Sequence, residues 1–357
     1  MMGTRSDSAS APSSGPLISV IMPSYNHAPF VERAVGSVLE QSLGDLELII
    51  VDDGSTDDSR RILKSLEDPR ISLIFQDNEG PSSALNTGLA RARGQYIAFM
   101  SSDDVSLPHR LQTQLEFMRA EQLDLVFTLP QLIDERGRRL DDGDFPAFFG
   151  KTFSSSAELF RLLFYQGNFL CAPSAFLRAD VLRAAGRFRP GSIQLQDFDM
   201  WVRMCPRSQI RLMGERLVQY RTRAEGNLSG GKHTVRMRFE LAVLYQSLLD
   251  NIPGAFLRAA FPDVVGPDVA ASAEDLELDK SFIYLSHEDP LIRAMGAQRL
   301  FSQLEDDRLA ARLRDERGFD LGQFFRMTDT LDFQNHGRLL ALKTECSRLR
   351  QLSRFRG

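Results

Sequence analysis

Residues 46–57 read LELIIVDDGSTD, an apolar, β-branched run that ends in acidic and small polar residues. Residues 17–26 (LISVIMPSYN) and 96–104 (YIAFMSSDD) repeat this pattern. A short run that is apolar at nearly every position is typical of a strand buried on both faces. Such strands occur in parallel sheets whose two faces are covered by helices. The three stretches therefore predict an α/β fold with a Rossmann-like, mostly parallel sheet flanked by helices.

The segments between these runs carry the spacing of amphipathic helices. After Pro29, which we place in the first turn of a helix, apolar residues recur three and four positions apart. Ser55 and Asp58 have the spacing of a capping box at the start of the next helix. The expected strands, with helices between them, span 17–22, 46–51, 71–75, 96–100, 123–127 and 210–220.

The pattern divides the chain into three parts. Residues 1–16 are rich in Ser and Ala and are expected to be a disordered lead-in. Residues 17–230 form the α/β domain, in which 129–152 break the pattern and are expected to pass over the active-site face. Residues 231–357 are expected to be a helical C-terminal region, with its last helix near 338–355.

Composition limits the classes of protein that fit. Of the 357 residues, 43% are hydrophobic and 25% charged, as in an ordinary globular protein, and the net charge of −5 gives no reason to expect a nucleic-acid partner. No run approaches the ~20 apolar residues of a spanning helix, and the N-terminus lacks the apolar core of a secretory signal. Three widely spaced cysteines indicate no oxidising compartment. We therefore expect a cytoplasmic protein.

Carboxylates follow two of the predicted strands at the edge where a doubly wound sheet binds ligands. Asp52 and Asp53 end one strand, and Asp103 and Asp104 follow another. Clustered carboxylates with no adjacent base suit a hard cation such as Mg²⁺ or Mn²⁺. Each motif alone has an alternative interpretation as a turn and helix cap. Because both follow apolar strands in one α/β pattern, a ligand site is the favoured interpretation.

Several ordered motifs resemble the family 2 glycosyltransferases, which have the GT-A fold. The resemblance covers about residues 17–230. It rests on the residues between Ile18 and Asn26, Gln41, Val51 to Asp57, Asn78 to Gly80, Ala84 to Asn86, Ala92 to Gly94, and Tyr96 to Asp104. The dinucleotide fingerprint GxGxxG and the P-loop GxxxxGK[ST] are both absent from the sequence.

The resemblance implies roles for residues at the strand ends. Pro23 and Tyr25 would line the pocket for the nucleotide's base and ribose, and Asp53 would hydrogen-bond the base. Asp103 would bind the metal ion that bridges the donor's diphosphate. Ser101 stands where the family often has the first carboxylate of Asp-x-Asp, so Asp104 is expected to assist. Leu85 stands where the family often has an arginine.

A catalytic base is expected near the sequence QDFDMW, residues 196–201. Asp197 matches the family's general base, which deprotonates the acceptor hydroxyl as it attacks. Gln196 replaces the glutamate that often precedes this base. Asp199 is interpreted as a helix N-terminal residue favoured by the macrodipole, and Trp201 as a core residue. Further along the chain, Arg221 or Arg223 would contact the donor's diphosphate.

The predicted function is inverting transfer of a sugar from a nucleotide-diphosphate donor, UDP being the favoured nucleotide. The acceptor is expected to be a hydroxyl of a glycan, a lipid-linked glycan or another molecule. One alternative is a nucleotide-sugar-binding protein with weakened catalysis, suggested by Ser101, Leu85 and Gln196. Another is a nucleotidyltransferase, which usually has a Gly-rich basic loop after its first strand where this chain has Pro23 to Asn26.

The C-terminal segment has an apolar stripe surrounded by basic residues. The stripe consists of Leu339, Leu342, Cys346, Leu349 and Leu352. A helix packed on the body of the protein is the favoured interpretation. The alternative is an amphipathic basic helix that contacts anionic lipid or pairs with another chain.

Overall fold

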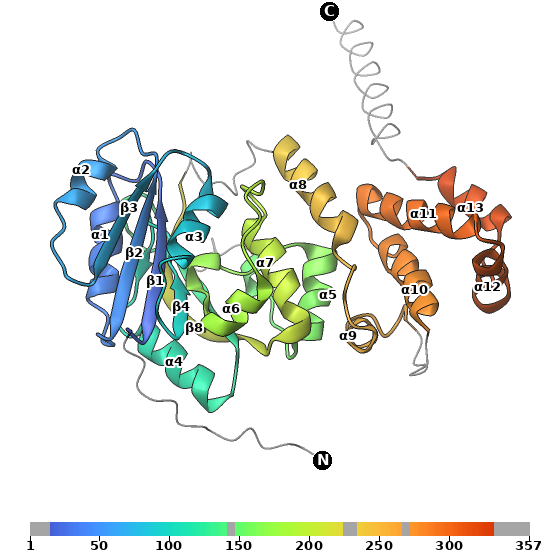
Figure 1. The fold of residues 1–357 in the computed structure, drawn as a ribbon, viewed down its shortest axis with the longest axis horizontal. Helices are drawn as coiled ribbons and strands as arrows, with labels where there is room; N and C mark the ends of the chain where they lie inside the picture. Colours follow the sequence, from blue (N-terminus) through green and yellow to red (C-terminus); the bar gives the residue numbers. More distant parts are fainter. Residues whose placement is uncertain (1–14, 141–146, 224–233, 266–271, 332–357) are drawn as a thin grey trace, which may run out of the picture. The chain divides into compact units, whose positions relative to one another are not determined.

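The computed structural model describes residues 15–140, 147–223, 234–265 and 272–331, and the chain divides into two compact units, 1–237 and 238–357. The first unit holds the sheet, and the described part of the second is helical (Figure 1). The expected lead-in falls almost wholly outside the described residues, as does the expected helix near 338–355. No helix in the described ranges is long and apolar enough to cross a membrane.

Among the described residues, eight strands form one mixed sheet in the order β3-β2-β1-β4-β7-β6-β8-β5. Strands β3, β2, β1 and β4 are parallel, as predicted. Their bounds are Ile71–Gln76, Leu46–Asp53, Ile18–Ser24 and Tyr96–Phe99, and those of β7, β6, β8 and β5 are Phe176–Arg178, Leu125–Ile133, Ile210–Arg221 and Val105–Ser106. The prediction of a mostly parallel α/β sheet is confirmed.

The other half of the sheet departs from the sequence prediction. Strand β7 inserts antiparallel between β4 and β6, and the short β5 pairs antiparallel with β8. Neither strand was expected. Strand β6 runs on to Ile133, so the pattern break expected at residue 129 begins five residues later, at residue 134. Pairing with β8 along this extension, through a register irregularity near Leu129, keeps it in the sheet.

Helices cover both faces of the parallel strands. Residues of α1, α2 and α4 pack against alternate residues of β1 and β2, such as Val20 and Leu48. Helix α3 lies on the other face, where a Cβ at Gly88 would stand 2.7 Å from the Ile21 side chain. The bounds are α1 Val31–Leu39, α2 Ser59–Lys64, α3 Pro81–Leu89, α4 Arg110–Ala120, α5 Ser156–Gln166, α6 Ala179–Ala185 and α7 Gln196–Met204.

Two predicted helix starts are wrong. Helix α1 begins at Val31, two residues after Pro29. The capping box at Ser55 and Asp58 does not form, because α2 begins at Ser59 without a side-chain cap. The Ser55 hydroxyl instead accepts a hydrogen bond from the backbone N–H of Asn26 at 2.9 Å. A contact distant in sequence therefore replaces the local one.

One motif behind the family resemblance is structural. A Cβ at Gly94 would lie 2.5 Å from the backbone nitrogen of Ser19, near the start of β1. The preceding Arg93 pairs with buried Glu47 near the start of β2, at 2.7 Å. Ser19 donates a further hydrogen bond to Glu47 at 2.6 Å. This network joins the N-terminal ends of the strands, opposite the predicted site.

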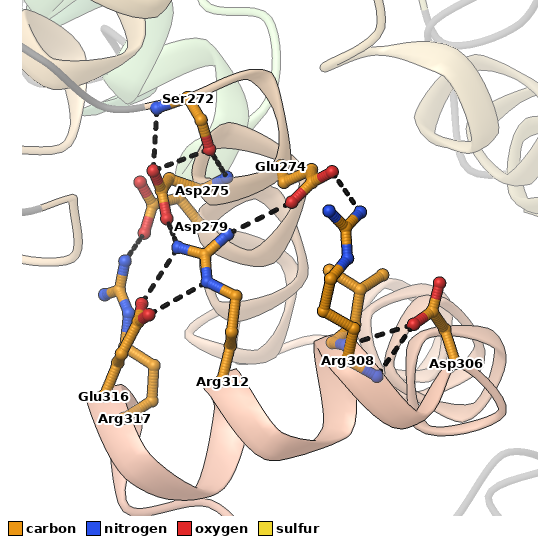
Figure 2. Close-up of polar contacts among 10 residues, drawn as sticks. Ser272, Glu274, Asp275, Asp279, Asp306, Arg308, Arg312, Glu316 and Arg317 are labelled. Atoms are coloured by element: carbon orange, nitrogen blue, oxygen red, sulfur yellow. Dashed lines mark hydrogen bonds and ion pairs between the residues drawn. The ribbon is translucent and has the colours of Figure 1, made fainter.

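The described part of the second unit is built from helices joined by ion pairs. Its core contains Leu278, Leu300, Leu313 and Phe324. Figure 2 shows Arg312 of α12 reaching Glu274 and Asp275 of α10 while it also pairs with Glu316. The helix bounds are α8 Thr234–Ser247, which begins in the first unit, α9 Gly254–Ala260, α10 Ala273–Leu285, α11 Pro290–Leu304, α12 Asp307–Arg317 and α13 Leu321–Thr328.

Candidate active site

The loops after β1, β2 and β3 are joined by hydrogen bonds between backbone N–H groups and side chains. Asn26 has a left-handed backbone (φ 53°), and its side-chain oxygen accepts the N–H of Thr56 at 2.8 Å. Gly54 has φ 80°, and a Cβ there would lie 2.6 Å from the backbone nitrogen of Asn78. Such positions favour glycine, or asparagine with a local hydrogen bond. The motifs YN and DDGS therefore build one rim.

Asp53 organises the third of these loops. Its carboxylate accepts hydrogen bonds from the Gln76 side chain at 2.8 Å and from the backbone N–H groups of Glu79 and Gly80 at 2.9 Å. A carboxylate offers about four lone-pair sites, so about one remains for a ligand donor. The neighbouring Asp52 is fully buried, pairs with Arg60 at 2.5 Å and accepts the N–H of Ser55 at 3.2 Å, so it stabilises the turn but caps no helix.

Pro23 and Tyr25 lie at the end of β1, beside Asp53. Pro23 pairs in register with Val51 of β2, so it lies in the last two residues of β1, just before the loop. The Tyr25 side chain is exposed (43%), which is uncommon for a large aromatic residue in a packed domain. An exposed ring at a strand end is free to stack on a planar ligand.

Asp103 and Asp104 follow β4, which is separated from Asp53 of β2 by the strand β1. Asp104 is buried; its Oδ1 accepts the N–H of Arg221 at 2.8 Å, and its Oδ2 has no partner among the described residues. Burial and then the charge of Asp103 raise the pKa of Asp104 well above its ordinary value. Asp103 Oδ2 lies 3.1 Å from a terminal nitrogen of Arg223.

His27, which the sequence analysis passed over, completes this cluster. Its Nδ1 is 2.7 Å from the Ser102 hydroxyl and its Nε2 is 3.1 Å from Arg223. Because arginine only donates, Nε2 accepts, and Nδ1–H donates to Ser102. Burial lowers the pKa of His27, so the neutral ring is favoured. Its position directly after the expected strand-end motif was the signal that could have identified it.

Arg221 sits behind this cluster. It is buried, its Nε donates to the backbone oxygen of Asp103 at 2.7 Å, and an Nη donates to that of Asp134 at 2.8 Å. The guanidinium also lies over the Phe30 ring, 4.6 Å from its centroid. In this arrangement Arg221 fixes the backbone beneath Asp103, and Arg223 is the arginine whose side chain meets the Asp103 carboxylate.

The donor set of this rim fits a hard divalent cation. Asp103 and Asp104 supply adjacent carboxylates, and the unpartnered Asp104 oxygen is a buried acceptor of the kind that a cation satisfies. No group of three or more His, Cys, Asp or Glu side chains in the described ranges could hold a metal by itself. A bound ion would therefore keep several positions for phosphate oxygens and water.

Asp197 lies in the first turn of α7. Its Oδ1 accepts the N–H of Phe198 at 2.8 Å, and its Oδ2 accepts a hydrogen bond from the side-chain amide of Asn168 at 2.7 Å. Burial raises the pKa of Asp197 from 3.8 to about 6. A carboxylate with this pKa is ionised at neutral pH but binds a proton far more readily than an exposed aspartate.

The segment that leads to Asp197 is fastened to α3. The Asn86 side chain donates to the backbone oxygen of Phe188 at 2.8 Å and accepts its N–H at 3.0 Å. The Ser82 hydroxyl donates to the backbone oxygen of Ser192. Helix α3 begins directly after Gly80, whose N–H bonds to Asp53. The same short helix therefore contacts both the loop bound by Asp53 and the segment that precedes Asp197.

Part of the chain matches a known protein family. Residues 19–186 match the model of glycosyl transferase family 2. The chain carries a family 2 glycosyltransferase domain.

Relatives and solved structures extend the comparison. A glycosyltransferase from Nostoc is 37% identical over 159 residues (44% of this chain, 48% of the relative). The putative teichuronic acid biosynthesis glycosyltransferase TuaG of Bacillus subtilis is 45% identical over 129 residues (35% and 51%). The matches thus span about half the length of these relatives. The crystal structure of S. aureus TarS 1-349 with UDP-GlcNAc has a TM-score of 0.56 at 16% identity and covers 84% of this chain and 92% of its own. This likeness confirms the GT-A fold.

Two neighbours of Asp197, which follow the residues matched to family 2, have structural roles. Asp199 is buried and pairs with Arg189 at 3.1 Å and with Arg203 at 2.8 Å, so it joins α7 to the segment before it. Trp201 is buried, with its ring centroid 4.9 Å from that of Phe127, as the core interpretation predicted. Gln196 has a buried side-chain oxygen without a partner in the described residues.

Proposed function

We propose that this protein is an inverting glycosyltransferase that moves a sugar from a nucleoside diphosphate, with UDP as the expected nucleotide, to an acceptor hydroxyl. The observation that carries the proposal is Asp197, a carboxylate whose pKa burial raises to about 6, in a chain whose residues 19–186 match glycosyl transferase family 2. A base poised near neutral pH suits proton abstraction from a hydroxyl. The acidic rim at Asp103 and Asp104 supplies the place for the donor's diphosphate.

Binding of the donor follows from the rim. The Tyr25 ring stacks on the nucleobase, and the remaining acceptor site of Asp53 receives a base N–H. Asp103 would hold Mg²⁺ or Mn²⁺ with help from Asp104. When bound, that cation neutralises the charge of the diphosphate and of the leaving group. Arg223, whose guanidinium pairs with Asp103 in this structure, would contact the diphosphate. Ser101 adds a short polar side chain.

Transfer then proceeds in one displacement. The acceptor hydroxyl gives its proton to Asp197 while its oxygen forms a bond to the anomeric carbon. The bond between that carbon and the diphosphate oxygen breaks on the opposite face, and the nucleoside diphosphate leaves with the electron pair. The configuration at the anomeric carbon is inverted, and each atom and charge is accounted for.

The acceptor is proposed to be a hydroxyl of a glycan or of a lipid-linked glycan. Support comes from the names of relatives, which include TuaG and the chondroitin synthase of Escherichia coli, 40% identical over 131 residues (36% of this chain, 19% of the relative). The proposed contact with a membrane through the basic C-terminal stripe involves residues outside the described ranges.

The test is donor binding and hydrolysis with a panel of UDP-, dTDP- and GDP-sugars, each with Mn²⁺ and with EDTA. Asp103→Ala should lose metal-dependent donor binding. Asp197→Asn should keep donor binding and lose turnover by about 10²- to 10⁴-fold, the usual contribution of a general base. Asp45→Ala is the matched control, because Asp45 is exposed at the other end of β2.

The outcomes separate the hypotheses. Metal-dependent turnover that depends on both aspartates supports the transferase. Donor binding with no turnover in the wild type, even with glycan acceptors present, would favour the weakened binding protein. A chain that binds no nucleotide sugar would refute the proposal.

A further inference from the structure

We propose that Asn168 is a positioning residue for Asp197, holding the carboxylate in the orientation that receives the acceptor's proton. This inference rests on the proposed function of Asp197. Asn168 lies 29 residues before Asp197 in the sequence, and its amide nitrogen is 2.7 Å from Asp197 Oδ2. It belongs to none of the motifs that carry the family resemblance.

The hydrogen bonds determine which way the amide of Asn168 faces. The Asn168 side-chain oxygen accepts the N–H of Leu170 at 3.1 Å. The NH₂ group must therefore be the end that faces Asp197, and a flipped amide would lose both hydrogen bonds. Asp197 Oδ1 is held separately by the N–H of Phe198 at 2.8 Å. One donor on each oxygen fixes the plane of the carboxylate and leaves the other lone pairs for a proton.

The backbone around Asn168 is built to hold this geometry. Helix α5 ends at Gln166, and the next residue, Gly167, turns the chain with a φ of 74° and donates its N–H to the backbone oxygen of Leu163. The next two residues, Phe169 and Leu170, are buried. The Phe169 ring also contacts Phe153, with centroids 6.4 Å apart. Asn168 thus projects from a fixed turn between a helix end and two anchored side chains.

Asn168 has an electrostatic effect as well as a geometric one. Burial raises the pKa of Asp197, and the hydrogen bond from Asn168 together with two backbone N–H groups opposes that rise. No charged side chain of the described ranges contributes to this balance. Asn168 is therefore the side chain that stabilises the ionised base, because a hydrogen bond to a charged form lowers the pKa of an acid.

Two substitutions test this role through the pH profile of donor hydrolysis. The assay uses the panel donor that wild type hydrolyses fastest with Mn²⁺. Asn168→Ala removes the hydrogen bond, so the acidic limb of kcat should move up by about one pH unit, with the donor KM unchanged. Asn168→Asp has nearly the same shape but places a second carboxylate beside Asp197, and the limb should move up further. Gln166→Ala, an exposed change two residues away, should leave the profile as in the wild type.

A second measurement needs no turnover. Urea unfolding followed by the fluorescence of Trp201, which lies in α7 with Asp197, gives stability against pH. If Asn168→Ala raises the pKa of Asp197, the loss of stability with rising pH should extend about one unit higher than in the wild type. This readout stands even if the chain hydrolyses no panel donor or if Asn168→Ala folds poorly, since Asn168→Asp can be measured in the same way.

An error in the proposed base and an error in the positioning role would give different results. If Asp197→Asn hydrolyses donor as the wild type does, the proposed base is wrong. If Asp197→Asn is inactive while both Asn168 variants keep the wild-type pH profile and the wild-type pH dependence of unfolding, the base stands and the positioning role is overturned.

Discussion

Replacing Asp197 with asparagine should change the pH dependence of stability as well as turnover. The pKa of this carboxyl is about 6 in the folded chain against an ordinary 3.8, a rise caused by burial. A group with a raised folded pKa binds a proton more readily in the folded than in the unfolded state. Between these two values the wild type therefore loses stability as pH rises, and above about pH 6 it carries the whole cost of the buried charge.

The size of the effect follows from the shift. About two pKa units correspond to at most about 3 kcal/mol, of which about 2 kcal/mol falls between about pH 4.5 and 7.5. Asp197→Asn removes this cost, so the stability of the variant minus that of the wild type should rise by about 2 kcal/mol across that range. The asparagine cannot accept both of the present hydrogen bonds, but that loss does not depend on pH.

The assay is urea unfolding at a series of pH values, followed by the fluorescence of Trp201, the only tryptophan in the sequence. Asp180→Asn is the control. The ion pair with Arg178 lowers the pKa of Asp180, so this residue is ionised in both states across most of the range, and its variant should run parallel to the wild type. If the difference in unfolding free energy between Asp197→Asn and the wild type does not change with pH, the Asp197 carboxylate is not buried as described.

Two further predictions concern parts of the fold away from the base. Gly54→Ala should destabilise the first unit by about 1–3 kcal/mol in urea, because φ is 80° and the new Cβ would meet the Asn78 backbone, whereas Gly44→Ala, with open space, should be nearly neutral; equal effects would contradict the strained turn. Arg312→Ala should lower the thermal stability of the second unit by about 1 kcal/mol at low salt and less at high salt, measured by far-UV circular dichroism, because Arg312 joins three carboxylates. Arg314→Ala, which loses a single exposed pair, is its control, and a loss independent of salt would count against the network.

Much of the site could be predicted because its signals are local. The apolar runs before Asp53 and Asp103 identify buried parallel strands, and the end of a strand places the next residue at the ligand edge of the sheet. Asn26 and Gly54 stand where a left-handed backbone is required, which only a few residue types tolerate. Asp197 was predicted as the base only through the family resemblance, since its own surroundings in the sequence also suit an ordinary helix start.

What the sequence determined, then, is the alternation of strands and helices in the first unit and the acidic residues at its strand ends, because hydrophobic periodicity and turn preferences act over a few residues. The tertiary structure decided the antiparallel insertion of β7, the start of α2 and the contact between Asn168 and Asp197. Each of these depends on a partner distant in the chain: a neighbouring strand, the N–H of Asn26, or a carboxylate beyond two further elements. The local sequence pattern does not identify such partners, because these contacts form only when the chain folds and brings distant residues together.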